Sequence, residues 1–296
     1  MKLHFNEGRA CDAVIRRLER RDGGLRGDLR RPDLEPESEH RIELAFHIND
    51  RLYALEHTVI EPFEGRIDLD SAAPRCVQPL VERVEPLLPQ TEDFELLLPY
   101  NAFDGLKGRK REGVVRALGD WTVKTAPTLE IGPIHRRLPQ ADSNVPGVPF
   151  PVQLHRSESI GPAGRRLLLR FTVPDVEDRR LKRIERALTA KCPKLAGWKA
   201  THGARTVLVL EHNDLDLTNV HFVTAALLKA EKNIAAAPDE VYLVMTALDT
   251  WFVWQLRVDG RTYFDLTDPE ERCYEVSSTE LVNLTDQIAA RVTSGS

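Results

Sequence analysis

Glu43 and Glu56 are the residues of this chain whose types and spacing could do chemistry together. They flank Asn49-Asp50, a pair that predicts a tight turn between two β-strands. If these two residues form the turn, Phe46 faces Tyr53 across the hairpin and Glu43 faces Glu56. Facing carboxylates repel each other unless a positive group lies between them. A divalent cation such as Mg²⁺ or Mn²⁺ could take that place, because it binds through carboxylates and keeps waters that can attack a phosphodiester.

The elements that position this pair are strands predicted over residues 41–48 and 51–58. Side chains alternate along a strand, which predicts an apolar face comprising Ile42, Leu44, Phe46, Ile48, Tyr53 and Leu55. The opposite face is predicted to carry small residues and, at one end, Glu43, Glu56 and Thr58. The same pattern also fits a plain solvated face on which Arg41 neutralises the two glutamates.

The order of a helix followed by this hairpin resembles the PD-(D/E)XK, or restriction-endonuclease-like, nuclease superfamily, whose core is an α-β-β-β-α-β unit. Glu56-His57-Thr58 matches the place of the E-x-K motif, Glu43 matches the preceding acid, and Asp33 lies in a literal Pro-Asp pair. Thr58 stands where the motif has the lysine that steadies the attacking water, and Glu43 stands where aspartate is commoner. The resemblance implies that Glu43 and Glu56 hold Mg²⁺, that Thr58 positions the water, and that the chain cuts or binds nucleic acid.

The whole chain has an ordinary globular composition. It has 296 residues, of which 42% are hydrophobic and 29% charged, enough for one large domain or two small ones. The net charge of −5 gives no general attraction to nucleic acid, so such binding must come from local patches. The four scattered cysteines predict neither a zinc site nor a disulfide framework. No signal peptide or membrane span is evident, so we expect a soluble, cytoplasmic protein.

Two basic segments are candidates for contact with phosphates. Residues 7–22 predict an amphipathic helix, and the candidate side chains on it are Arg16, Arg17, Arg20 and Arg21. The second segment is a predicted glycine-flanked loop over residues 105–113, which carries Lys107, Arg109, Lys110 and Arg111. This loop could contact a phosphate or supply the lysine that position 58 lacks. Both segments also fit ordinary solvated surfaces.

The remaining pattern predicts an α/β protein with a mixed sheet flanked by helices, and the resemblance implies that its core is restriction-endonuclease-like. Strands are expected over residues 94–98, 165–173, 206–210, 241–246 and 251–258. Helices are expected over residues 71–88, 176–191 and 217–233, the last capped by Asp216. Alternating strands and helices indicate parallel neighbours. The Pro- and Gly-rich residues 126–164 are expected to connect a lobe at 1–125 to an α/β lobe at 165–293, with the lobes packed as one compact unit.

Other positions leave alternatives open. The run Glu211-His212-Asn213-Asp214 follows an apolar strand, where ligands often bind in α/β sheets, and it fits either a separate metal site or a polar turn. His57 is expected to be buried and hydrogen-bonded, because alternation points it toward the apolar face. The chain lacks the motifs of serine hydrolases, P-loop NTPases and Rossmann dehydrogenases.

Three functions are therefore compatible with the sequence. The first is a metal-dependent, nuclease-like protein that acts on or binds nucleic acid. The second is a catalytically inactive, nuclease-like interaction module, with a protein partner or a second copy of the chain as its target. The third is an unrelated metal-dependent hydrolase centred on Glu211, His212 and Asp214.

Overall fold

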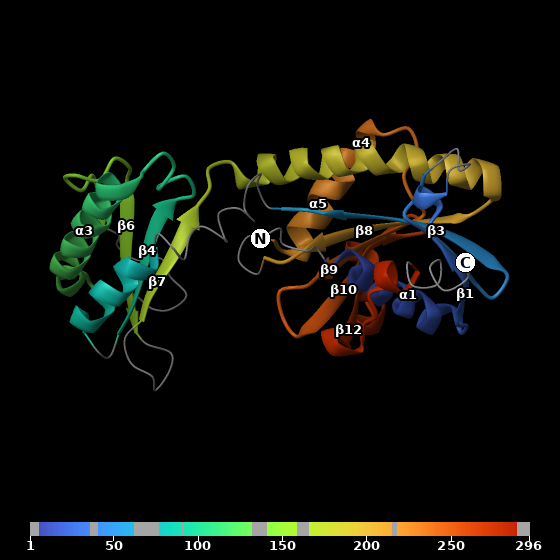
Figure 1. Ribbon diagram of the computed structural model, residues 1–296, viewed down its shortest axis with the longest axis horizontal. Helices are drawn as coiled ribbons and strands as arrows, with labels where there is room; N and C mark the ends of the chain where they lie inside the picture. Colours follow the sequence, from blue (N-terminus) through green and yellow to red (C-terminus); the bar gives the residue numbers. More distant parts are fainter. Residues whose placement is uncertain are drawn as a thin grey trace. The chain divides into compact units, whose positions relative to one another are not determined.

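The computed structural model describes residues 6–35, 41–61, 77–89, 92–131, 141–158, 166–214 and 218–288 (Figure 1). The chain divides into two compact units. The first unit comprises Met1–Glu64 and Val176–Ser296, and the second comprises Gly65–Asp175. This division differs from the expected lobes at 1–125 and 165–293, because the second hairpin strand pairs with a strand from the second half of the chain.

A mixed eight-stranded sheet forms the centre of the first unit. Its strands lie in the order β1 (Arg26–Arg30), β2 (Leu44–Ile48), β3 (Arg51–Val59), β8 (Arg205–His212), β9 (Glu240–Met245), β10 (Thr250–Val258) and β11 (Arg261–Thr262). The strand β12 (Cys273–Ser277) pairs with β10. Strands β3, β8 and β9 run parallel, whereas the pairs β1–β2, β2–β3 and β9–β10 are antiparallel. The expectation of a mixed sheet flanked by helices is confirmed.

Helices cover both faces of this sheet (Figure 1). Helix α1 (Glu7–Asp22) packs on one face through the predicted stripe of Ala10, Cys11, Val14, Ile15 and Leu18, all of which are buried. Helices α4 (Val176–His202) and α5 (Val220–Ala230) pack on the other face. Helix α4 continues well beyond the predicted end at Lys191. Helix α5 is capped by Asn219, whereas the predicted cap Asp216 lies outside the described residues.

The hairpin forms with the predicted register. Phe46 pairs with Tyr53, and their rings stack with centroids 5.3 Å apart. The prediction for Ile42 is wrong, because this residue packs in the core under α4 rather than beside Leu44 and Phe46. The regular strand begins at Leu44, so strict alternation does not extend to residue 42.

The second unit has its own four-stranded sheet, in the order β5 (Ala141–Ser143), β6 (Val152–Glu158), β4 (Glu92–Pro99) and β7 (Arg166–Thr172). Its core packs under α3 (Gly108–Thr125) and the helical residues 77–84. Two predictions need correction here. Residues 126–164 supply β5 and β6, which are short and separated by turns rich in Pro and Gly, and residues 108–113 are helical rather than a loop.

Short elements complete the fold. They are α6 (Pro269–Arg272) and the 3-10 helices η1 (Pro32–Leu34), η2 (Glu85–Leu87), η3 (Ala126–Thr128), η4 (Glu231–Asn233), η5 (Tyr263–Asp265) and η6 (Ser278–Glu280). None of the helices within the described ranges combines the length and apolar composition that crossing a bilayer requires. Along the chain, the first unit begins α1-β1-β2-β3, continues after the inserted second unit with α4-β8, and so runs α-β-β-β-α-β.

Candidate functional site

Lys191 of α4 lies between the two hairpin glutamates. Its Nζ atom is 2.6 Å from Glu43 Oε1 and 2.6 Å from Glu56 Oε2. Lys194 lies on the same side of the helix, with its Nζ atom 3.4 Å from Glu56 Oε1. The positive group that facing carboxylates require is therefore an ammonium group supplied by α4. The only sequence signal for it was the three-residue spacing of these lysines on a basic amphipathic helix, and this spacing does not identify the two glutamates as their partners.

Burial makes the charge of Glu56 costly. Its side chain is 0% exposed, whereas that of Glu43 is 16% exposed. Burial and the repulsion of Glu43 raise the pKa of Glu56 above its ordinary value, and the two lysines offset only part of that rise. Although Lys191 Nζ is close to Glu56 Oε2, no donor is aligned for a hydrogen bond to this oxygen. Glu56 is thus a buried carboxylate with incomplete compensation.

Lys191 remains charged in this setting. Burial lowers the pKa of Lys191, but the attraction and hydrogen bond of Glu43, together with the close contact with the Glu56 carboxylate, outweigh burial and raise the pKa above its ordinary value. Glu43 is held from a second side, because its Oε2 atom accepts a hydrogen bond of 2.6 Å from the backbone N–H of His57. The backbone of β3 and the helix α4 together fix the direction of the Glu43 carboxylate.

His57 points to the opposite face of the sheet, as predicted, and pairs there with Glu211. The distance from His57 Nε2 to Glu211 Oε2 is 2.8 Å, and the two side chains are 5% and 4% exposed. Thr246 Oγ1 donates a hydrogen bond of 3.1 Å to Glu211 Oε1. This buried chain of contacts joins β3 to β8 and to the end of β9, directly behind the backbone N–H that holds Glu43.

The separate metal site considered at Glu211, His212 and Asp214 does not form. Alternation along β8 places Glu211 and His212 on opposite faces of the sheet. His212 Nδ1 lies 3.0 Å from the backbone oxygen of Asp214, and burial lowers the pKa of His212 to about 4, so the ring is neutral near pH 7. Within the described ranges, no group of three or more His, Cys, Asp or Glu side chains is arranged to hold a metal ion.

Thr58 is half-buried on β3 and lies on the same face as Glu56. Asp33, in the Pro-Asp pair, accepts a hydrogen bond of 2.8 Å from Arg31 Nη2. Neither residue makes a contact with Lys191 that compares with those of the two glutamates. The group formed by Glu43, Glu56 and Lys191 is therefore the one that the structure brings together.

The four candidate arginines of α1 all contact groups within the first unit. Arg21 binds Glu240 and the Tyr53 hydroxyl, Arg16 binds Asp12, and Arg17 Nη2 donates to the backbone oxygen of Glu271. Arg20 contacts Glu270, but its side chain is 60% exposed. Among these four, Arg20 is the one whose exposure best suits contact with a phosphate.

The second basic segment lies in the second unit, at the start of α3. Lys107, Arg109 and Lys110 are exposed there, and Arg111 is half-buried. Exposed cations at a helix N-terminus suit an anion, so their assignment as nucleic-acid contacts stays a prediction. The lysine beside Glu56 comes instead from α4.

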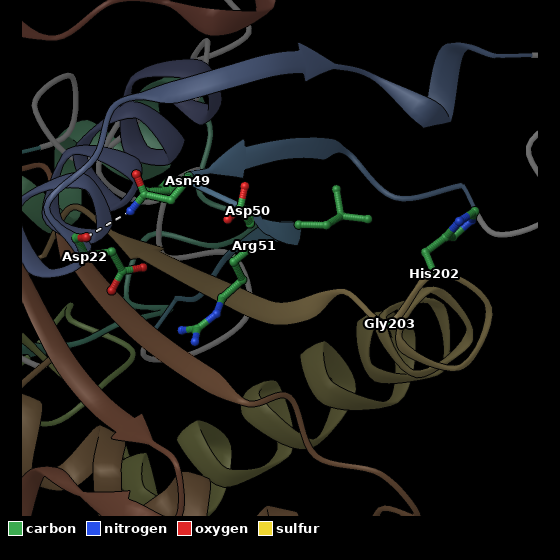
Figure 2. Close-up of a pocket in the computed structure, with 8 residues that line it drawn as sticks. Asp22, Asn49, Asp50, Arg51, His202 and Gly203 are labelled. Atoms are coloured by element: carbon green, nitrogen blue, oxygen red, sulfur yellow. Dashed lines mark hydrogen bonds between the residues drawn. The ribbon is translucent and has the colours of Figure 1, made fainter.

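A polar pocket of about 650 Å³ lies at the turn end of the hairpin (Figure 2). Its lining includes Asp22, Asn49, Arg51 and His202, and Asn49 Nδ2 donates a hydrogen bond of 3.1 Å to the backbone oxygen of Asp22. The Asp22 carboxylate is already engaged by Arg21 and by the Tyr53 hydroxyl. This pocket is separate from Glu56, which lies further along β3.

Comparison of the chain with protein-family models, with curated proteins and with solved structures gave no match.

Proposed function

We propose that the chain is a metal-dependent, nuclease-like protein whose active site is formed by Glu43, Glu56 and Lys191. The observation that supports this proposal is the contact of one ammonium group with two carboxylates at 2.6 Å, on a chain whose elements run α-β-β-β-α-β. In the family that the hairpin resembles, a lysine steadies the attacking water. Lys191 replaces Thr58 as our candidate for that role.

The donor set suits a hard divalent cation such as Mg²⁺ or Mn²⁺. Carboxylate oxygens are the usual protein ligands of Mg²⁺, and the site has two carboxylates. One of their oxygens, Glu56 Oε2, has no aligned hydrogen-bond donor. When bound, the cation would neutralise developing charge on a phosphate and make water more acidic. Glu43 and Glu56 would hold the ion, and Lys191, moved away from between them, would orient a water molecule by donating to its oxygen.

A cleavage assay with four proteins tests this proposal. Plasmid, single-stranded DNA and RNA are incubated with Mg²⁺ or Mn²⁺ and with the wild type, Glu56→Gln, Lys191→Met or the double variant Thr58→Lys/Lys191→Met. We expect both single variants to lose cleavage, because one loses a metal ligand and the other the ammonium group. The double variant should regain part of the cleavage activity, since a lysine placed at position 58 lies on the same face as Glu56.

Lys182→Met is the matched control, because Lys182 is an exposed lysine of the same helix. Cleavage that persists in Glu56→Gln would show that another nuclease or another site is responsible. A wild-type protein that cleaves none of these substrates with either metal would contradict the proposal directly.

The second candidate is an inactive interaction module. One specific observation favours it: Lys191 and Lys194 already surround the Glu56 carboxylate, as in an ordinary buried ion-pair cluster. Calorimetric titration with Mn²⁺ separates the candidates, because only the nuclease-like protein should bind the ion, and Glu56→Gln should abolish that binding. Sedimentation analysis would then show whether the target is a second copy of the chain.

A further inference from the structure

Helix α3 of the second unit packs on its sheet through one side and exposes the other (Figure 1). The packed side carries Val114, Leu118 and Thr122, which are all buried. Because each residue turns the helix by about 100°, the opposite side is an arc of about 120° that carries four basic residues. All four are exposed, and they are Arg109, Lys110, Arg116 and Lys124. We name these four residues the basic face of α3.

The cations of the basic face are not used to hold the fold together. Within the part of the chain that the structure describes, none of the four forms an ion pair or a side-chain hydrogen bond. The two acids of α3 do not cancel their charge. Asp120 is engaged by Arg83, whose Nη2 atom lies 2.6 Å from Asp120 Oδ1, and Glu112 lies at the margin of the face. The basic face therefore keeps a net positive charge in a chain whose net charge is −5.

Two features of α3 weaken the helix and favour the approach of an anionic polymer. Its first turn contains Arg109, Lys110 and Arg111 and no acid, although the positive end of a helix favours acids. Gly113 lies near the centre of the basic face, and a Cβ atom placed there would meet nothing within 4 Å. Glycine is unfavourable inside a helix, but it lets another backbone come close. The centre of the face is thus flat and is flanked by cations.

The shape and chemistry of this face suit a duplex rather than an unpaired strand or a membrane. Trp121, the aromatic residue of α3, is partly buried against the core, so the face offers no ring on which an unpaired base could stack. The apolar side of α3 is packed inside the second unit and cannot enter a lipid bilayer. Arg109 and Lys124 are roughly 22 Å apart along the axis, and a duplex carries one negative charge per about 1.7 Å, so several phosphates can face the helix.

We propose that the basic face of α3 binds the sugar-phosphate backbone of a nucleic-acid duplex, which passes over Gly113, whatever its base sequence. Contacts of lysine and arginine with phosphates supply affinity that does not depend on sequence and that falls with salt. The choice of a nucleic acid rests on the proposed function. The second unit is inserted between β3 and α4, which carry Glu56 and Lys191, so a duplex held on α3 is tethered through the chain to the candidate site and its local concentration there is raised.

Salt-dependent binding tests the basic face without any cleavage. Fluorescence anisotropy of a labelled DNA duplex is measured in metal-free buffer at several salt concentrations, with the wild type and with the triple variant Arg109→Gln/Lys110→Gln/Arg116→Gln. Each phosphate contact contributes about 0.9 to the slope of log K against log salt concentration. We therefore expect the triple variant to bind more weakly and to reduce the magnitude of this slope by about 2.7. Glutamine is a good helix former, so circular dichroism should show an unchanged fold.

A matched variant separates the basic face from net charge. Lys182→Gln/Lys229→Gln/Lys232→Gln changes the net charge by the same amount at exposed lysines of the first unit, and it should bind as the wild type does.

Gly113→Leu adds bulk to the basic face without changing its charge, and should weaken binding severalfold while favouring the helix. Equal losses in the two triple variants, an unchanged slope in the α3 variant, unaltered binding by Gly113→Leu, or no binding of the duplex would overturn the proposal. So would binding of phosphatidylserine vesicles in place of the duplex, which is the result expected of a membrane-binding surface.

The two proposals can fail separately. Duplex binding that is lost in the α3 variant, in a wild-type protein without cleavage, would support the basic face and contradict the reaction. Cleavage that depends on Glu56, together with duplex binding that the α3 variant leaves unchanged, would support the reaction and overturn the basic face.

Discussion

Lys191 changes how the two hairpin glutamates, Glu43 and Glu56, affect the stability of the protein. Lys191 lies between the two carboxylates and offsets their mutual repulsion, so that the three side chains form an ion-pair cluster. Removing one partner of a buried ion pair destabilises a protein by more than the intact pair stabilises it, because the remaining charge stays buried without compensation. Lys191 therefore affects stability whether or not the site is catalytic.

We expect Lys191→Met to lower the free energy of unfolding by about 3 kcal/mol, the low end for a broken buried pair, because Lys194 still contacts Glu56. Urea-induced unfolding measures the change. Lys182→Met, on an exposed position of the same helix, should change stability by less than about 0.5 kcal/mol. Equal stability of the two variants would show that the cluster is not needed for folding.

The raised pKa of Glu56 predicts a dependence of stability on pH. A carboxyl group whose pKa is higher in the folded state binds its proton more tightly there, so its stabilising contribution is complete below the unfolded pKa near 4.5 and disappears as pH rises through the folded pKa. Glu56→Gln lacks this titration. We expect the wild type to lose stability relative to Glu56→Gln as pH rises above about 4.5.

Urea unfolding of both proteins at a series of pH values measures that difference. Glu112→Gln, at an exposed position of α3, serves as the control and should follow the wild type at every pH. A difference between wild type and Glu56→Gln that stays constant with pH would mean that the carboxyl group titrates as it does in the unfolded chain.

The His57–Glu211 contact predicts a second effect on stability. Glu211→Ala leaves a buried imidazole and the Thr246 hydroxyl without their acceptor, and should cost about 2–4 kcal/mol. Glu211→Gln keeps an oxygen acceptor and should cost clearly less. Thermal or denaturant unfolding compares the two, and equal losses would mean that packing rather than hydrogen bonding decides the effect.

At the level of elements, the hairpin was predictable because its turn residues and its alternation agree. Asn49 has φ 53°, a left-handed conformation that asparagine tolerates better than most residues. The pair Asn49-Asp50 fixed the register, and the register placed Glu56 on one face and His57 on the other. The residues of the hairpin itself were therefore sufficient to predict its register.

We expect Asn49→Val to destabilise the first unit by about 1–3 kcal/mol relative to Asn49→Gly, because a β-branched side chain is strained at positive φ. Both variants lose the hydrogen bond to the backbone oxygen of Asp22, so the comparison isolates the backbone effect. Denaturant unfolding measures it. If the valine variant is as stable as the glycine variant, the turn must relax to another conformation.

Other elements could not be predicted from local sequence. The place of Lys191 depends on α4 packing against a hairpin that lies far away in the chain, and no pattern around residue 191 reveals its partner. Strand β6 was missed because it is flanked by Pro and Gly and pairs with β4 only after the chain has folded back. Both features depend on contacts between residues that are far apart in the chain, rather than on local secondary-structure propensity.

At the scale of the whole molecule, all strand pairs of the first sheet join residues of the first unit. Replacing residues 65–175 by a flexible Gly/Ser linker should therefore leave a folded unit with cooperative unfolding. Circular dichroism and urea unfolding test this, and the Lys191→Met variant of the shortened chain should show the same loss of stability as in the full chain. A shortened chain without a cooperative transition would show that residues 65–175 are required for folding.

The parallel pairing of β3 with β8 also has a consequence for synthesis on the ribosome. Leu55 pairs with Val207, roughly 150 positions later, so the inner edge of β3 has no neighbour when it leaves the exit tunnel. At about 5–20 residues per second, translation takes on the order of 8–30 s to deliver the missing strand. The intervening segment is a compact body that can finish folding within that interval, while the nascent hairpin waits with an open apolar edge that molecular chaperones recognise.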